Sequence, residues 1–513
     1  MFAKNQIFAN PRNSSLWKLL QLSQGNKPHQ HQRRCAVNNL SPVRTFSTEY
    51  SSSLADSFYN EEQKKLQTTV SKIVETEILP HVEKWENAEE FPSHFIIKKF
   101  GNASLLGIRF DTDYGGLGFD YKYHAAYLEE LGSIPAAGIC AGITAHTEIT
   151  LPALARFGSA ELKSEFLSPS IAGDVVACLG VSEPQAGSDV ANIKTSAVRT
   201  GDDLIINGQK TWITNGLKAD WICLLANTSQ GSAHKNKSLI CVPMNSKGIS
   251  RTKIHKLGWN SSDTAQLFFE DVRVPAKNII GDEGSGFMYQ MLQFQEERLC
   301  MALVTLRALD KAISDTIEYT RQRQAFGRSI LDNQVVHFRL AELATEIEAL
   351  RALTYRSVEM MVNGENVTRT ASMAGRLSRL TADSCLQFFG GMGYTRDVFI
   401  SRFFRDGRLT SIGGGADEIM LEIITRVLNI AERTNKCGTV AFYETGSIFW
   451  EDESPNSERT DAEEIPRFAH LLTFSSLGVP SCGRANLTVS FHDLVTLSLW
   501  QRRYSDTAPF PPI

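Results

Sequence analysis

The sequence lacks the features that mark several large classes of protein. No apolar run approaches the roughly 18 residues needed to cross a bilayer, so we expect no integral membrane segment. The formal net charge is -4, so there is no cationic excess with which to bind nucleic acid. The 9 cysteines form no CxxC pair and no zinc-like Cys/His spacing, and their odd number cannot pair completely. We therefore expect no metal site and a reducing compartment.

Three glycine-rich segments could be mistaken for a dinucleotide-binding fingerprint. They are residues 115–118, 284–286 and 390–393. In a Rossmann phosphate site such a segment follows a strand and opens a helix within a βαβ unit. Because none of the three is expected to do so, nicotinamide binding of that kind is disfavoured.

The first 48 residues contain no aspartate or glutamate but several lysines and arginines, with abundant Ser, Gln and Asn. This composition is typical of a mitochondrial transit peptide, and it predicts a protein of the mitochondrial matrix. A disordered basic tail is the alternative interpretation of residues 1–48.

The hydrophobic pattern changes twice along the chain. From about residue 60 to 156 apolar positions recur at helical spacing, from 175 to 274 short alternating runs predict strands, and from 286 to 429 helical spacing returns. We expect a multidomain α+β protein in which the last helices form an antiparallel bundle. The expected divisions are 58–174 (helical), 175–282 (β), 283–432 (helical bundle) and 433–513, a C-terminal extension whose fold and role the sequence does not predict.

Four motifs carry the functional signal, and they occur in order along the chain. They are Leu179-Gly180-Val181-Ser182-Glu183-Pro184-Gln185-Ala186-Gly187-Ser188, then Gln209-Lys210-Thr211-Trp212-Ile213-Thr214, then Arg323-Gln324-Ala325-Phe326-Gly327 with Gln334, then Gln387-Phe388-Phe389-Gly390-Gly391. Together these resemble the signatures of the acyl-CoA dehydrogenase family over about residues 60–430. Each motif alone has an ordinary explanation: a hairpin turn at 182–189, a core position for Trp212, a solvated charge for Arg323 and a helix C-cap at Gly390.

The resemblance implies a helical N-terminal domain, a middle β-barrel or sandwich domain, a C-terminal four-helix bundle and an FAD cofactor. It implies a homotetramer in which some cofactor contacts come from a neighbouring subunit, and reoxidation by the electron-transferring flavoprotein. The positions that match cofactor contacts are Leu179, Val181, Ser182, Gly187, Ser188, Trp212, Ile213, Thr214, Arg323, Phe326, Gln334, Gln387, Gly390, Gly391, Ala416 and Glu418.

Removal of an α-proton from an acyl thioester needs a carboxylate in a dry pocket, with a pKa raised by burial. One branch of the family places its glutamate at the position of Gly414, which has no side chain here. A smaller branch, including the long-chain and isovaleryl enzymes, uses an earlier helix, where this chain has Glu297. Glu296 is the neighbouring competitor, and because adjacent helical residues point about 100° apart, only one can face the flavin. The resemblance favours Glu297.

The resemblance also implies which positions contact the substrate. Ser188, Gln295, Arg298 and Gly414 match such positions, although simple surface polarity explains Gln295 and Arg298 equally well. Gln185 replaces a common glycine, and a left-handed backbone at this position would cost about 1 kcal/mol. Ala416 replaces a common threonine, which costs about 1 kcal/mol more if the threonine hydroxyl normally bonds the cofactor. The sequence leaves open whether either residue weakens FAD binding.

Three functions remain open on the sequence. The chain is a dehydrogenase of straight medium-to-long acyl-CoA thioesters, a dehydrogenase of branched short ones, or an idle family member that serves as an assembly or binding protein. The loop 414–420 resembles the long-chain members and favours the first.

Overall fold

The computed structural model describes residues 53–369, 377–428, 430, 439–442 and 448–451. The transit-peptide interpretation of residues 1–48 and most of the 433–513 extension lie outside these residues. Within the extension the described backbone is one antiparallel hairpin, β11 (Thr439–Phe442) with β12 (Ile448–Glu451).

The N-terminal part is helical, as expected. Asn60 caps α3 by accepting from two backbone N–H groups, and Asp120 caps α6 in the same way. Pro92 stands directly before α5, where a proline is tolerated. The α-helices are α2 (Ser53–Phe58), α3 (Glu61–Ile73), α4 (Val82–Ala88), α5 (Ser93–Asn102), α6 (Tyr121–Leu131), α7 (Ala137–Thr144), α8 (Leu151–Phe157), α9 (Ala160–Leu162) and α10 (Ser168–Ile171). The intervening 3-10 and π segments are η1 (Val74–Ile78), η2 (Leu79–His81), η3 (Thr112–Tyr114), η4 (Ala145–Thr150) and η5 (Lys163–Leu167).

The middle part forms one eight-stranded sheet in the order β6-β7-β3-β2-β4-β5-β8, with β1 also paired to β4. Alternate residues of β4 pack on opposite faces: Trp221 joins a core shared with the helices, and Ile222 joins a core between strands. The strands are β1 (Ala177–Gly180), β2 (Ser196–Thr200), β3 (Asp203–Ile213), β4 (Trp221–Asn227), β5 (Lys237–Pro243), β6 (Ile249–Lys253), β7 (Ala265–Pro275) and β8 (Ile279–Ile280). Short 3-10 turns are η6 (Val190–Asn192) and η7 (Ala276–Asn278).

The glycine-rich segment 284–286 departs from the sequence expectation, since it does follow a strand, β8, and open a helix, α11. However, β8 pairs antiparallel with β5, and the next strands, β9 and β10, form a separate hairpin. The segment is therefore not part of a βαβ unit, which keeps a Rossmann site disfavoured.

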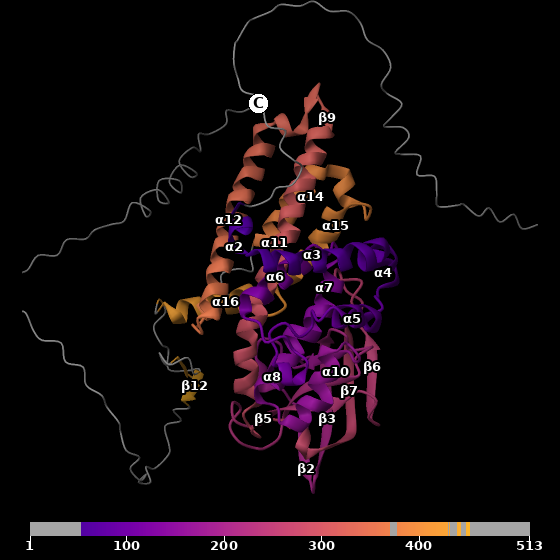
Figure 1. Ribbon diagram of the computed structural model, residues 1–513, viewed down its shortest axis with the longest axis vertical. Coiled ribbons are helices and arrows are strands. Elements are labelled where there is room, and N and C mark those ends of the chain that lie inside the picture. The colour runs from indigo at the N-terminus through magenta and orange to yellow at the C-terminus, as the bar shows by residue number, and fades with distance from the viewer. Residues whose placement is uncertain (1–52, 370–376, 429, 431–438, 443–447, 452–513) are drawn as a thin grey trace, which may run out of the picture. The chain divides into compact units, whose positions relative to one another are not determined.

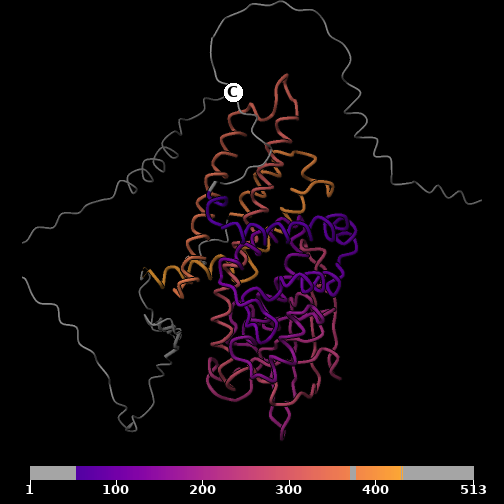
Figure 2. The backbone as a smooth tube through the Cα atoms, viewed as in Figure 1, coloured from indigo at the N-terminus to yellow at the C-terminus, as the bar shows by residue number. Residues whose placement is uncertain are grey.

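The C-terminal part is built on α11, which runs without interruption through 37 residues. In Figures 1 and 2 the N-terminal helices α3 to α7 lie between the sheet and the upper parts of α11, α12 and α14, whereas α8 and α10 lie at the level of the sheet. The elements are α11 (Gly286–Gln322), β9 (Gln324–Ala325), β10 (Arg328–Ser329), η8 (Ile330–Asp332), α12 (Gln334–Val362), α14 (Leu377–Phe389), η9 (Gly390–Tyr394), α15 (Phe399–Gly407), η10 (Leu409–Ser411) and α16 (Asp417–Val427).

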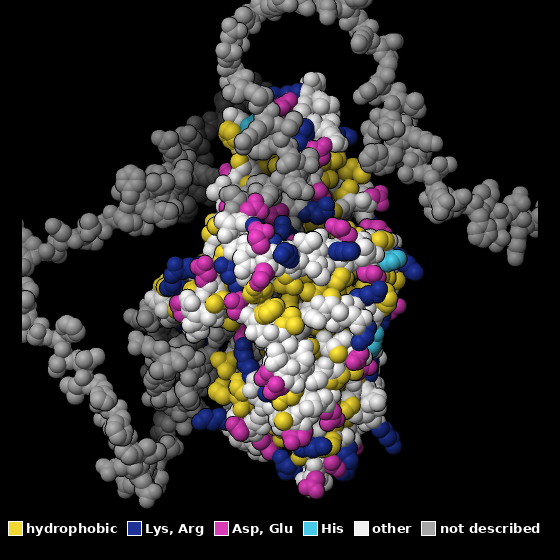
Figure 3. Space-filling view, in the orientation of Figure 1, with side chains coloured by type: hydrophobic (Ala, Val, Ile, Leu, Met, Phe, Trp, Pro, Cys, Tyr) yellow, Lys and Arg dark blue, Asp and Glu magenta, His cyan; other side chains and the backbone are white. Residues whose placement is uncertain are grey.

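The surface and the cysteines agree with the composition. Lysines and arginines are interspersed with aspartates and glutamates on the face shown in Figure 3. In the part of the chain that the structure describes, no helix is long and apolar enough to cross a membrane, and no cluster of His, Cys, Asp and Glu could hold a metal ion. The six cysteines within the described ranges are buried and free.

Candidate active site

Two adjacent glutamates of α11, Glu296 and Glu297, are both buried, each with 6% of its surface exposed. Glu296 forms ion pairs with Arg109, whose Nη1 lies 2.5 Å from its Oε2, and with Arg156. Burial alone would raise the pKa of Glu296, but the two arginines bring that pKa below its usual value. Glu296 is therefore ionised, and its negative charge is balanced by the two arginines.

Glu297 has no such ion pair among the described residues. Its Oε1 accepts a hydrogen bond from Gln293 Nε2 at 3.2 Å. Burial raises the pKa of Glu297 to about 8, while Gln293 and Arg298 act in the opposite direction. A carboxylate with such a pKa takes up a proton readily near neutral pH, which is the property that a general base needs.

Arg298 of α11 lies close to the glycine loop that precedes α16. A side-chain carbon placed on Gly415 would lie 3.7 Å from Arg298 Nε, an atom that is buried and has no hydrogen-bond partner among the described residues. Gly414 has a left-handed backbone (φ 74°) with open space around it. Ala416 follows and Glu418 lies exposed in the first turn of α16, whereas Gln295 is half-buried. Arg298, the residue that follows Glu297, thus lies beside the loop at 414–416.

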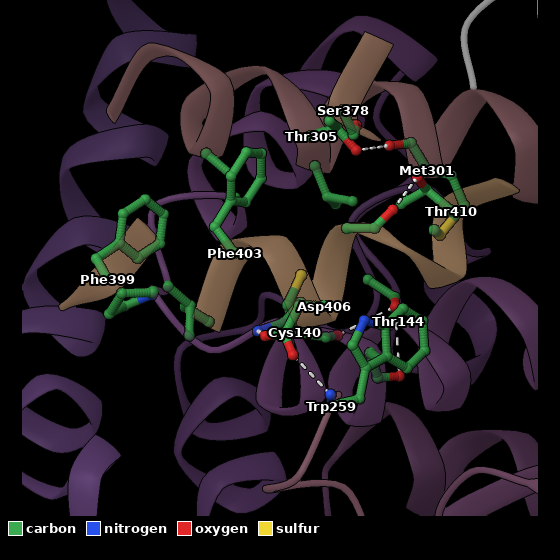
Figure 4. Close-up of a pocket in the computed structure, with 18 residues that line it drawn as sticks. Cys140, Thr144, Trp259, Met301, Thr305, Ser378, Phe399, Phe403, Asp406 and Thr410 are labelled. Atoms are coloured by element: carbon green, nitrogen blue, oxygen red, sulfur yellow. Dashed lines mark hydrogen bonds between the residues drawn. The ribbon is translucent and has the colours of Figure 1, made fainter. Parts of the chain in front are cut away.

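A largely apolar cavity lies along α11, beginning one turn after Glu297, which is not itself among its lining residues. It encloses about 640 Å³ of empty space, including its opening. Met301, Val304, Thr305 and Ala308 line it at positions 4, 7, 8 and 11 after Glu297, which places all five on one face of the helix. In Figure 4, Phe399 and Phe403 of α15 lie on the side opposite Trp259 and Thr144.

The predicted cofactor residues of the β domain also lie together. The N–H of Thr211 donates to the carbonyl of Ser182 at 2.9 Å, and Lys210 Nζ donates to the carbonyl of Val181 at 2.9 Å. These bonds hold the segment that contains Leu179, Val181 and Ser182 against the end of β3 that contains Trp212 and Ile213, with Thr214 directly after it; Gly187 and Ser188 follow in the loop after Ser182. The segment η4 connects this group to α11, because Ala177 of β1 donates to His146 and Gln293 donates to the carbonyl of Ile149.

Trp212 is the least expected residue of this group. Its side chain is 63% exposed and its backbone is left-handed (φ 64°), so the alternative interpretation as a core tryptophan is wrong. A bulky residue rarely adopts this backbone unless the surroundings require it.

The remaining predicted cofactor residues lie elsewhere in the same chain. Arg323 follows Glu297 by 26 positions, and α11 rises about 1.5 Å per residue, which separates them by roughly 39 Å. The hydrogen bond from Tyr319 Oη to the carbonyl of Phe389, at 3.2 Å, holds this end of α11 against α14. The group at this end consists of Arg323, Phe326, Gln334, Gln387, Gly390 and Gly391.

The residues present fit the flavin dinucleotide that the resemblance implies. The exposed indole of Trp212 offers a flat apolar surface, and Gly187, Gly390 and Gly391 have open space where a side chain would stand. Backbone N–H groups and the hydroxyl of Ser188 supply donors of the kind that flavin carbonyls accept.

The condition for strain at Gln185 is not met. Gln185 is not among the residues with a positive φ, and it lies in a turn closed by the backbone hydrogen bonds that Glu183 and Ala186 exchange at 3.0 Å. No strain therefore arises from the missing glycine.

Sequence reasoning missed Arg109, Arg156, Gln293 and the cavity. Gln293 stands four residues before Glu297, a spacing that places two side chains side by side on a helix, so it could have been found. The two arginines lie 140 or more residues away in sequence, and no local pattern connects them to Glu296.

Comparison with known proteins agrees with this architecture. Family models match residues 60–174 (acyl-CoA dehydrogenase, N-terminal domain), 178–272 (middle domain) and 284–429 (C-terminal domain). The long-chain specific acyl-CoA dehydrogenase of Rattus norvegicus is 36% identical over 72% of this chain and 86% of that protein. The isovaleryl-CoA dehydrogenase of Arabidopsis thaliana is 31% identical over 75% and 96%. The crystal structure of an acyl-CoA dehydrogenase from Geobacillus kaustophilus is similar with a TM-score of 0.69, at 37% identity over 73% of this chain and 99% of that one. The chain therefore belongs to the acyl-CoA dehydrogenase family of FAD-dependent oxidoreductases.

Proposed function

We propose that this chain dehydrogenates straight medium-to-long fatty acyl-CoA thioesters to trans-2-enoyl-CoA, with Glu297 as the catalytic base. The observation that carries the proposal is the contrast on α11. Glu297 is buried, forms no ion pair among the described residues and has a pKa raised to about 8, while Glu296 forms ion pairs with two arginines.

In this reaction the carboxylate of Glu297 takes the α-proton, the α C–H electron pair forms the new double bond, and a hydride leaves the β-carbon. The bound FAD supplies the acceptor for that hydride. The backbone N–H of Gly414 donates to the thioester carbonyl and stabilises the negative charge that develops there. Ser188, Gln295 and Arg298 are proposed to contact the CoA portion.

The cavity supports a long acyl chain. Its lining on α11 begins at Met301, about 6 Å from Glu297 along the helix, and continues to Ala308, about 16 Å away. Apolar groups dominate the wall, so burial of each methylene contributes about 0.8 kcal/mol to binding. A branched short acyl group would leave the part near Ala308 unused.

The proposal extends to partners and location. The separation of Arg323 from Glu297 supports an assembly in which a second copy completes the cofactor site, and we propose a homotetramer. The electron-transferring flavoprotein is the proposed electron acceptor. The acid-free first 48 residues support import into the mitochondrial matrix.

The test is an anaerobic titration of the purified protein with octanoyl-, palmitoyl- and isovaleryl-CoA while the flavin absorbance is followed. Wild type is expected to bleach with octanoyl- and palmitoyl-CoA. Glu297→Gln is expected to retain its yellow flavin without bleaching, and the folded fraction of Glu296→Gln is expected to bleach.

Other results would identify the competing functions. Bleaching by isovaleryl-CoA alone would show a branched short-chain dehydrogenase. Absence of bleaching with every thioester, in a protein that retains flavin, would show an idle family member. Equal loss in the Glu296 and Glu297 variants would contradict the assignment of the base.

A further inference from the structure

Gln293 lies one helical turn before Glu297 and is itself buried, with 1% of its surface exposed. Its side-chain amide bonds to the backbone of another segment, at the junction of the π segment η4 with α8. Nε2 donates to the carbonyl of Ile149, and Oε1 accepts from the N–H of Ala153 at 3.1 Å. Those two backbone groups are the pair that would bond to each other as one rung of a continuous α-helix. The side-chain amide of Gln293 therefore bridges a carbonyl and an N–H that are hydrogen-bond partners in a regular α-helix, at the irregular part of this helix.

This arrangement permits only one orientation of the amide. A backbone carbonyl only accepts and a backbone N–H only donates, so the nitrogen of Gln293 must face Ile149 and the oxygen must face Ala153. The second N–H of the same nitrogen is then left to donate to Glu297 Oε1, at 3.2 Å. A donor, and never an acceptor, is consequently held against the carboxylate.

We propose that Gln293 is a positioning residue, whose amide is locked by the backbone at Ile149 and Ala153 and holds the ionised carboxylate of Glu297 on the cavity face of α11. This inference rests on the proposed role of Glu297 as the base. A carboxylate fixed before the substrate enters does not have to reorganise during proton removal, and the bond stabilises its charged form.

The other charged and titratable groups around Glu297 do not replace this contact. Arg298 and Glu296 act on its pKa from its own helix with opposite signs, and Cys300 lies one turn away. From other elements, Glu148 of η4, Cys140 of α7 and Arg109 act on Cys300. Among the described residues, Gln293 donates the hydrogen bond to the carboxylate of Glu297.

The test compares Gln293→Met and the smaller Gln293→Ala with a matched control, Gln290→Met. Gln290 lies on the same face of α11 one turn earlier, is fully buried, and its amide has no hydrogen-bond partner among the described residues. The measured quantity is kcat/KM for octanoyl-CoA from pH 6 to 10, whose lower limb reports ionisation of the base in the free enzyme. Thermal unfolding identifies variants that fail to fold.

In both Gln293 variants the lower limb of the kcat/KM profile is expected to move to higher pH by about one unit, because the ionised carboxylate of Glu297 loses a hydrogen bond. The plateau above the limb is expected to fall by roughly tenfold through lost orientation. Gln290→Met is expected to leave the limb in place. An unchanged limb in both folded Gln293 variants would overturn the inference. Continued bleaching in Glu297→Gln would instead overturn the proposed function, so the two failures are distinguishable.

Discussion

Glu296 and Glu297 are adjacent and equally buried on α11, yet among the described residues Glu296 forms ion pairs with two guanidinium groups and Glu297 accepts a hydrogen bond from an amide. One helical step, about 100°, produces this difference. It turns one glutamate towards Arg109 and Arg156 and the other towards the face that carries the cavity. The two glutamates thus differ in charge balance, and we propose that Glu296 is structural and Glu297 reactive.

The first prediction concerns the structural charge. Glu296→Gln is expected to lower the free energy of unfolding by about 3 kcal/mol, because it leaves the buried Arg109 without its closest carboxylate. Glu342→Gln is the control, since Glu342 pairs with Arg339 on an exposed surface, where ion pairs contribute about 0–1 kcal/mol. Chemical denaturation measures both, and similar losses in the two variants would contradict the buried role.

The second prediction concerns pH. Burial raises the folded-state pKa of Glu297 to about 8, above the unfolded value of roughly 4.3. The protonated form is thus favoured in the folded protein, and its contribution to stability is complete below pH 4.3 and is lost as pH rises through 8. Wild type is expected to lose about 1.4 kcal/mol per pH unit within this window relative to Glu297→Gln. Parallel stability curves for the two proteins would show that Glu297 titrates normally.

The sequence allowed much of this architecture to be predicted. Hydrophobic spacing indicated the helix, strand, helix order, and the motif register selected Glu297, because both signals are local. The sequence also disfavoured a Rossmann dinucleotide site, and none of the glycine-rich segments lies in a βαβ unit, although β8 and α11 do flank one of them.

Contacts between distant segments could not be predicted in this way. The bonds of Gln293 to Ile149 and Ala153 span 140 or more residues and depend on a π segment that no spacing indicated. Whether Gln185 is strained could not be decided from the sequence for a related reason. The residues around it determine the turn, and replacement of a glycine does not by itself show that a left-handed backbone is needed.

The third prediction moves the base. Gly414 has a left-handed backbone with open space for a side chain, at the position where another branch of the family has its glutamate. Adding Gly414→Glu to Glu297→Gln is expected to restore flavin bleaching to at least a few per cent of the wild-type rate, with a backbone strain of about 1 kcal/mol. Gly414→Ala in the same background carries the strain without the carboxylate and should stay inactive. Equal inactivity of the two double variants would contradict the proximity of residue 414 to the substrate.

The fourth prediction tests the cavity. Ala308→Phe is expected to fill the part farthest from Glu297 and to lower kcat/KM for palmitoyl-CoA at least tenfold more than for octanoyl-CoA. Overpacking is expected to cost about 1–3 kcal/mol of stability. Ala308→Val should lower kcat/KM for palmitoyl-CoA relative to octanoyl-CoA by an intermediate factor. Ala308→Ser should change this ratio very little, because serine is close to alanine in volume. A uniform loss for both substrates would show that this cavity does not hold the acyl chain.

The last prediction tests whether two copies share one cofactor site. Arg323 lies roughly 39 Å from Glu297 along α11, so we expect the guanidinium of one copy to serve the flavin beside Glu297 of another. Arg323→Ala should lose flavin, and Glu297→Gln should keep flavin without bleaching. When the two variants are co-expressed, mixed assemblies contain sites in which Glu297 of the Arg323→Ala chain meets Arg323 of the Glu297→Gln chain. Random pairing would place about one quarter of all sites in this intact state. Bleaching is therefore expected only after co-expression and not when the separately purified variants are combined without exchange. If co-expressed assemblies contain both chains and still fail to bleach, each copy must complete its own site, and the separation along α11 would need a different explanation.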